Sequence, residues 1–193
     1  PAATASRTTF DLNNFTLSVG GTVDRLMEFN KTDAILTITD GSTAKGGTLS
    51  INRTSTASVY TVVVSGGELK MTGGRIYAEN QKDKVDNNSW WPAIAVYVGG
   101  STNAKLTMTG GTVQAEAKYA AYPIYSYSTS NISGGTVRAN ATGAGNARCV
   151  EVLKGTTTIS GTAHLIASGT TGITGCIADA WISTNGTSKN EGT

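Results

Sequence analysis

The segment AKLTMTGGTVQAEA at residues 104–117 decides the fold, because close relatives of it recur along the chain. They read ELKMTGGRIYAEN at 68–80, SNISGGTVRANA at 130–141 and TTISGTAHLIAS at 157–168. Each copy contains a Gly-Gly pair at the equivalent position, and the pairs are residues 46–47, 73–74, 110–111 and 134–135. A shortened copy has the single glycine Gly161 instead. Sequence periods of about 20–50 residues indicate repeats that stack on one another to bury their apolar sides.

Each repeat contains three short segments in which apolar and polar residues alternate, which is typical of strands with one buried face. Examples are AIAVYV (93–98), KLTMT (105–109) and TVQAE (112–116). Stacking the copies aligns aliphatic residues in columns, such as Leu49, Ile76, Val113, Val137 and Ala163 on the third segment. No apolar pattern of helical period lasts more than two turns. We therefore predict an all-β fold, a three-faced parallel β-helix solenoid with three short strands per coil and about six coils.

Three segments, TFDLNNFTLSV (9–19), ILTITD (35–40) and GGTLSI (46–51), resemble bacterial extracellular repeats of the right-handed parallel β-helix (pectin-lyase-like) group. The resemblance extends over about residues 9–183 and implies a right-handed solenoid located outside the cell or on its surface. We expect one domain over 1–193, with a loop insertion at 80–92 and a loose polar tail at 184–193. The fold alone does not imply a function, since it carries enzymes, adhesins and structural modules alike.

The composition argues against several classes of partner. The net charge is +2 and no run of Lys or Arg occurs, so we predict no nucleic-acid partner. Apolar stretches such as 93–98 are too short to span a bilayer, so we expect no membrane insertion. His164 is the sole histidine, and each Gly-Gly pair precedes a strand rather than a helix, so we predict neither a metal site nor a cofactor.

The polar positions of the second segments form two columns rich in threonine, which include Thr37, Thr107 and Thr109. Regular Thr-x-Thr ladders are typical of ice-binding solenoids, so ice binding is one alternative function. Lys70 and Asn131 interrupt the array, and threonine also suits exposed strand positions in general.

Aromatic side chains give the best candidate for a ligand site. Tyr97, Tyr125 and Tyr127 lie on the first segments of neighbouring repeats, near Trp90 and Trp91 of the insertion. Rings that gather on a surface suit stacking on sugars or on a protein partner. Alternatively, the insertion folds back and buries both tryptophans against the solenoid.

The third segments present a mixed polar face, on which Tyr77 and Arg138 are candidates for binding a polysaccharide or glycan. Glu79 and Glu116 are the only stacked acids, followed by Asn140. Paired carboxylates can act as general acid and base, as in polysaccharide lyases and hydrolases of this fold. Because the other acidic residues are scattered, we predict no catalytic residues and no enzyme.

Two sequence features bear on secretion. Cys149 and Cys176 each open the first segment of a repeat, and stacked strands about 4.8 Å apart would bring them within reach of a disulfide. Two buried thiols are the alternative. Candidate N-glycosylation sites of the form Asn-x-Ser/Thr occur at Asn14, Asn30, Asn52, Asn87, Asn131, Asn140 and Asn185.

Solenoids must cover their open ends, and no amphipathic capping helix is visible at either end of the sequence. We therefore expect self-association or neighbouring domains of a longer protein as partners. The leading hypothesis is a non-catalytic extracellular or cell-surface structural and adhesive module that assembles end to end into a filament. The alternatives, in order, are a carbohydrate-binding module that uses the surface aromatics, a polysaccharide lyase or hydrolase, and an ice-binding protein.

Overall fold

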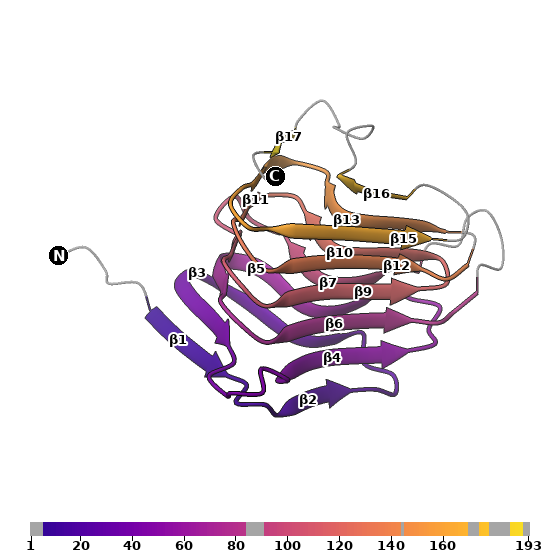
Figure 1. Cartoon of the computed structure of the whole chain (residues 1–193), viewed down its shortest axis with the longest axis horizontal. Helices are drawn as coiled ribbons and strands as arrows, with labels where there is room; N and C mark the ends of the chain where they lie inside the picture. The colour runs from indigo at the N-terminus through magenta and orange to yellow at the C-terminus, as the bar shows by residue number, and fades with distance from the viewer. Residues whose placement is uncertain (1–5, 84–90, 144, 170–173, 178–185, 191–193) are drawn as a thin grey trace.

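The computed structural model describes residues 6–83, 91–143 and 145–169, and the backbone alone of residues 174–177 and 186–190. Over these ranges the chain is all-β, and its strands form two sheets in which every pairing is parallel (Figure 1). Sheet B lies across the front of this view, with its strands stacked one above another. Its strands are β2 (Thr16–Val19), β4 (Thr48–Arg53), β6 (Arg75–Asn80), β9 (Thr112–Ala117), β12 (Thr136–Ala141) and β15 (His164–Gly169).

Sheet A consists of two arms that share the long strands β3 (Arg25–Thr39) and β5 (Val59–Met71). Arm 1 continues from their first parts through β7 (Ala93–Val98), β10 (Ala120–Ser126), β13 (Asn146–Val152) and β16 (Thr174–Ile177). Arm 2 contains their second parts together with β1 (Ser6–Asp11), β8 (Lys105–Met108), β11 (Thr129–Ile132), β14 (Gly155–Ile159) and β17 (Gly186–Asn190).

The bend in β5 between the two arms requires a glycine. Gly67 has a φ of 74°, a backbone conformation that side chains with a Cβ rarely adopt. A Cβ at this position would lie 2.3 Å from the carbonyl oxygen of Lys31 and 2.6 Å from that of Ala34. The sequence therefore allows β3 and β5 to approach closely where sheet A turns from arm 1 into arm 2.

The register places equivalent residues of neighbouring repeats opposite one another. On sheet B, Leu49, Ile76, Val113 and Val137 follow each other across successive strands, and all four are fully buried. Removing such side chains from water, at about 25 cal/mol per Å² of apolar area, is the main stabilisation of the stack. The predicted aliphatic columns are thus present over these repeats.

The structure differs from the sequence expectation in the last described repeat. We aligned Ala163 with Val137, but the register pairs Val137 with Leu165 and Thr136 with His164. The turn at Gly161 is one residue longer than the preceding Gly-Gly turn, whereas the single glycine suggested a shorter one.

Three further differences concern the number and extent of the strands. The first and second segments of the early repeats run together as single strands, β3 and β5, instead of forming separate ones. Within the tail that was expected to be loose, the described residues 186–190 form β17, which pairs in parallel with β14. At the other end, pairing begins at Ser6, before the expected first residue of the repeats.

Buried polar groups fix two loops. The Asp40 carboxylate accepts hydrogen bonds from the backbone N–H groups of Asn14, Ser42 and Gly47 and from the Ser42 hydroxyl. The Ser42 hydroxyl and these N–H groups lower the pKa of Asp40 to about 2, although partial burial opposes the shift. The carboxylate thereby connects the turn after β1 to the loop that precedes β4.

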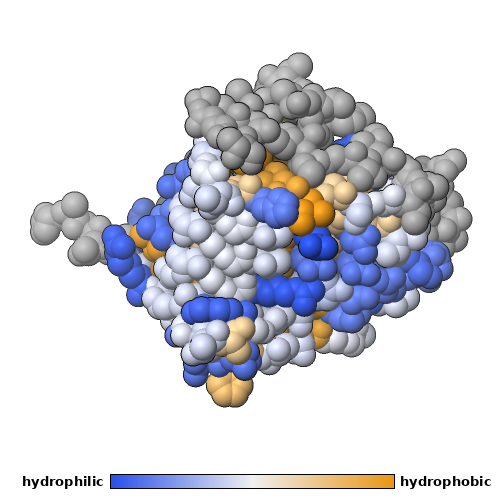
Figure 2. Space-filling model, in the orientation of Figure 1, coloured by the Kyte–Doolittle hydropathy of each residue, from blue (hydrophilic) through white to orange (hydrophobic). Residues whose placement is uncertain are grey.

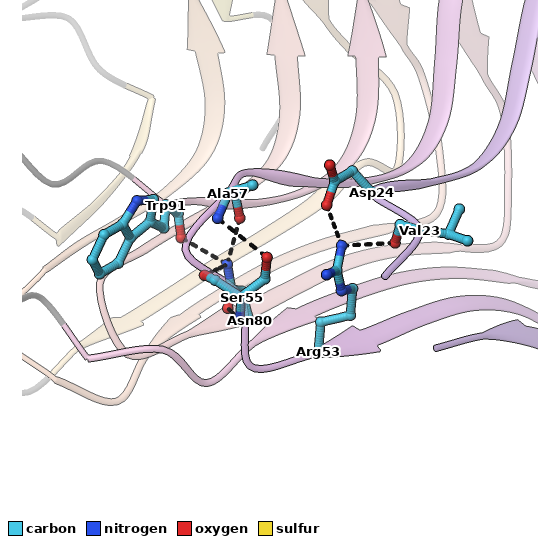
Figure 3. A network of polar contacts seen from close by, with 7 residues as sticks. All are labelled: Val23, Asp24, Arg53, Ser55, Ala57, Asn80 and Trp91. Atoms are coloured by element: carbon cyan, nitrogen blue, oxygen red, sulfur yellow. Dashed lines mark hydrogen bonds and ion pairs between the residues drawn. The ribbon is translucent and has the colours of Figure 1, made fainter. Parts of the chain in front are cut away.

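The second loop is held by Asn80, the fully buried last residue of β6 (Figure 3). Its Oδ1 accepts from the N–H groups of Ser55 and Lys82, at 3.0 and 3.2 Å. Its Nδ2 donates to the carbonyl oxygens of Ser55, Ala57 and Trp91, at 3.2, 3.0 and 3.2 Å. One amide thus joins the loop that follows β4 to the residues that lead into β7.

The interior becomes polar near the far end of arm 2. The column of Leu36, Leu69 and Leu106 continues with Ser130 and then Thr157, both of which are buried. The Ser130 hydroxyl forms a hydrogen bond with that of Ser126, at 3.1 Å. The Thr157 hydroxyl has no hydrogen-bond partner.

Candidate functional site

Five tyrosines gather on the outer side of arm 1, and we call them the tyrosine group: Tyr60, Tyr97, Tyr122, Tyr125 and Tyr127. Tyr97 and Tyr125 are opposite each other on β7 and β10, and their rings stack with centroids 6.0 Å apart and planes 19° apart. Tyr60 meets Tyr97 edge-on at 5.9 Å, and Tyr127 lies 5.9 Å from Tyr97 and 5.8 Å from Tyr125. The centroids of Tyr122 and Tyr125 are 5.7 Å apart.

The group forms because two columns of arm 1 point outward. One contains Val63, Tyr97, Tyr125 and Glu151; the other contains Tyr60, Ile94 and Tyr122. Burial raises the pKa of both Tyr97 and Tyr125 above the ordinary value of tyrosine.

Gly99 leaves room for this arrangement. A Cβ at Gly99 would lie 3.0 Å from the Tyr97 ring and hydroxyl and 3.1 Å from the Cβ of Tyr127. Tyr127 is the most exposed of the five tyrosines, at 41%.

Two hollows flank Tyr97 and share it and Gly100 as lining residues. The first has a volume of about 260 Å³ and is completed by Arg25, Tyr60, Val63 and Ser65. The second, of about 340 Å³, is completed by Ser101, Thr102, Tyr127 and Lys154. Each hollow combines aromatic walls with hydroxyl groups and one cation, which are the side chains that small polar ligands require.

The structure brings together only some of the residues proposed from the sequence. Tyr97, Tyr125 and Tyr127 meet as expected, whereas Trp90 lies outside the described residues. Trp91 is half-buried just before β7, where its carbonyl oxygen accepts from Asn80. Trp91 lines neither of the two hollows.

Tyr77 and Arg138 lie apart from the tyrosine group, in one outward column of sheet B with Gln114 between them. The Arg75 guanidinium lies 4.3 Å from the centre of the Tyr77 ring and donates to Gln114 Oε1 at 3.0 Å. The Tyr77 hydroxyl donates to Glu79 at 2.9 Å, and burial followed by this carboxylate raises the pKa of Tyr77. Arg75, Tyr77, Gln114 and Glu79 thus contact one another across a face that is mainly hydrophilic to neutral in colour (Figure 2).

The stacked acids of sheet B lie as the sequence predicted. Glu79 is opposite Glu116, and Glu116 is opposite Asn140 on the next strand. Glu79 also accepts from Gln81 Nε2 at 2.8 Å. The part of the chain that the structure describes contains no group of three or more His, Cys, Asp or Glu side chains placed to hold a metal ion.

The threonine columns of arm 2 have the predicted register, in which Thr37, Lys70, Thr107 and Asn131 follow each other. Charged contacts occupy the middle of this face. Glu68 lies 3.3 Å from Lys105 Nζ and accepts from the Thr107 hydroxyl at 2.6 Å. Burial acts to raise the pKa of Glu68, but Thr107 and Lys105 outweigh it and the pKa is lowered. An ordered array of free hydroxyls, as ice binding requires, is interrupted here.

The backbone register places Cys176 of β16 opposite Cys149 of β13, since both flanking positions pair. Cys149 is buried, and the side chain of Cys176 lies outside the description. Among the candidate glycosylation sites, Asn87 and Asn185 also fall outside the described ranges. The others are exposed at Asn14, Asn30 and Asn52 and half-buried at Asn131 and Asn140.

Sequence reasoning missed Tyr60, Arg25, Val63 and Lys154, which complete the two hollows. In the second repeat the alternating pattern of the sequence indicates a first segment TVVV at 61–64, which leaves out Tyr60, whereas β5 begins at Val59. Alignment of TVVV (61–64) with the last four residues of AIAVYV would have placed Val63 beside Tyr97. The signal was therefore present for Val63 and Tyr60, whereas Arg25 and Lys154 lie on segments whose alignment gave no such indication.

No described residue belongs to a helix long and apolar enough to cross a membrane. Comparison of the chain with protein-family models, with curated proteins and with solved structures finds no match.

Proposed function

We propose that this chain is a right-handed parallel β-helix that serves as a non-catalytic structural and adhesive module outside the cell or on its surface. The observation that carries the proposal is the unbroken register of buried aliphatic residues over successive repeats. Such a stack presents its outward side chains at fixed spacings without needing a ligand or metal to order them. A release of reducing ends or unsaturated products from uronate polysaccharides would contradict the non-catalytic assignment.

We further propose that copies of the chain stack end to end through the β2 end. β2 is the outermost strand of sheet B at this end. Phe15, which directly precedes it, and Leu17 within it are 73% and 45% exposed. Leu17 is opposite Leu49 and therefore begins a column whose next members are buried. Pale orange atoms mark this lower end of the molecule in Figure 2. A strand edge of this kind accepts another strand, and a contact between unlike ends that repeats along the stacking axis extends into a filament instead of closing into a ring.

Light scattering after size exclusion, followed by electron microscopy, tests the assembly. We expect elongated particles from the native chain and smaller ones from Leu17→Lys, because a charge at the column end opposes stacking. Thr136→Lys places the same charge on the side of the stack and is the matched control. A native chain that stays monomeric at millimolar concentration would refute assembly.

Location outside the cell is supported by the cysteine register. Neighbouring parallel positions allow Cys149 and Cys176 to form a disulfide, and such bonds persist in oxidising compartments. We expect the protein, produced by secretion, to lack titratable thiols after denaturation and to gain about 2 Da on reduction. Two reactive thiols would remove this support.

A second candidate function is carbohydrate binding, and the tyrosine group with its two hollows favours it. Aromatic rings flanked by hydroxyl groups are suited to sugars, which have apolar faces and polar edges. A glycan array probed with the labelled full chain tests this function. Absence of signal from every glycan, confirmed at millimolar concentration by NMR, would exclude it.

A further inference from the structure

The first hollow exists because one position of an outward column carries a small residue. The column runs from Glu28 on β3 through Val63 and Tyr97 to Tyr125. Tyr125 stacks on one face of the Tyr97 ring, and the short Val63 side chain leaves space on the other side. Tyr60, edge-on to Tyr97, forms a second wall. The result is a slot with an apolar floor and two aromatic walls.

The rim of this slot is polar and held in place. Glu28 Oε2 accepts from Arg25 Nη1 at 2.8 Å, and Glu28 Oε1 accepts from the Ser65 hydroxyl at 3.3 Å. The Arg25 guanidinium also lies 5.8 Å from the centre of the Tyr60 ring. A guanidinium carries five N–H donors, so one bond to Glu28 leaves others to point toward a ligand.

We propose that the slot over Val63 binds one pyranose ring of a neutral oligosaccharide, with the next ring in the hollow beside Lys154. This inference rests on the second proposed function, and it specifies the site and the ligand class. The C–H face of the sugar packs on the exposed side of Tyr97, while hydroxyl groups bond to Arg25 and Ser65. The ring in this slot is neutral because Glu28 already offsets the charge of Arg25, the one cation of its lining.

The two hollows act together because Tyr97 and Gly100 line both. Gly100 has a φ of 93°, and a Cβ there would come within 3.2 Å of the Ser65 Cβ. Because Gly100, which lines both hollows, carries no side chain, a ligand of at least two rings can occupy both. A proline-rich peptide, which also packs between aromatic rings, fits less well because hydroxyl and charged groups form much of both linings.

Val63→Tyr is the decisive variant. A tyrosine at this position stands opposite Tyr97 as Tyr125 does on the other side, so it can stack on Tyr97 and fill the slot without disturbing the fold. Thr136→Tyr introduces the same side chain at a half-buried position of sheet B and serves as the matched control. Arg25→Ala is a second site variant. Because the Arg25 side chain is exposed, we expect this variant to fold like the native chain.

The full chain is titrated with cellohexaose, xylohexaose and mannohexaose and followed by calorimetry and saturation-transfer NMR. Polygalacturonate is the acidic comparison and a proline-rich decapeptide the peptide comparison. We expect one neutral hexasaccharide to bind, with strongest transfer from the protein to C–H protons on one face of a ring. Val63→Tyr and Arg25→Ala should each weaken binding at least about tenfold, and Thr136→Tyr should change it less than about twofold.

The outcomes separate this inference from the function on which it rests. Binding of a neutral glycan that survives both site variants would overturn the assigned slot and leave carbohydrate binding standing. Binding of polygalacturonate alone would overturn the neutral class. Binding of the peptide alone, or of none of the probes, would overturn the inference, whereas carbohydrate binding as a function is decided separately by the glycan array.

Discussion

Replacement of Asn80 by alanine tests whether one buried amide holds the stacked repeats together at the insertion. The native side chain makes five contacts with backbone groups, three through Nδ2 and two through Oδ1. Alanine removes all of them and adds no new partner. The partners at Ser55 stay buried, whereas those at Ala57, Lys82 and Trp91 are half-buried and can be reached by water.

The magnitude follows from the two Ser55 groups. A buried donor or acceptor left without a partner costs about 1–3 kcal/mol, so the N–H and C=O of Ser55 together give about 3 kcal/mol. We expect Asn80→Ala to lower the free energy of unfolding by that amount. Asn52→Ala, an exposed position on the neighbouring strand β4, should change it by less than about 0.5 kcal/mol.

Urea denaturation followed by circular dichroism measures both variants, and amide hydrogen exchange gives the local readout. The N–H groups of Ser55 and Lys82 should exchange faster in Asn80→Ala, since both lose their acceptor. An unfolding free energy within about 0.5 kcal/mol of the native value, with unchanged exchange at Ser55, would refute the structural role assigned to Asn80.

Three further predictions concern the backbone, the interior and the response to pH. Gly67→Ala should cost about 3 kcal/mol because its Cβ meets two carbonyl oxygens, whereas Gly21→Ala, with a similar φ of 77° and nothing within 4 Å, should cost only about 1 kcal/mol of backbone strain. Equal thermal stabilities of these two variants would contradict the close approach of β3 and β5. Thr157→Val should raise the unfolding free energy by about 1 kcal/mol, since it replaces an unpartnered buried hydroxyl by a methyl group; a loss of stability in urea would disprove this. Asp40 is deprotonated more easily in the folded chain, with a pKa of about 2 against 3.8 when unfolded. Its ionised form therefore adds to the free energy of unfolding above about pH 4, and this stabilisation is lost as the pH falls toward 2. Unfolding free energies between pH 5 and pH 2 should therefore fall less steeply for Asp40→Asn than for the native chain, and parallel curves would argue against this role.

The sequence predicted the all-β class and the parallel pairing because repetition constrains both. Once Leu49, Ile76 and Val113 occupy equivalent positions, stacking them in register is the simplest way to bury all three. The prediction failed where a single glycine replaced a pair: turn length depends on local backbone geometry, and the position of Gly161 alone did not fix it. The register of Leu165 was therefore misplaced by two residues.

The candidate site was predicted less completely than the fold. The register of the first segments indicated that Tyr97 and Tyr125 meet, but a hollow depends on what is missing from a column as much as on what is present. The sequence gives no reason to assign a binding role to Val63, since it is neither aromatic nor polar. Arg25 lines the first hollow directly and is held by Glu28 on the same strand, and nothing in the repeat pattern marks either residue as functional.

The parallel register described for both sheets also determines how the stack responds to force. Hydrogen bonds between strands run roughly perpendicular to the strands. They therefore lie along the axis on which the repeats are stacked. Tension applied between the first and last repeats therefore pulls these bonds along their length and opens them one layer after another. A tether built this way lengthens stepwise under load and dissipates work at each step, whereas the same chain pulled sideways must shear many bonds at once.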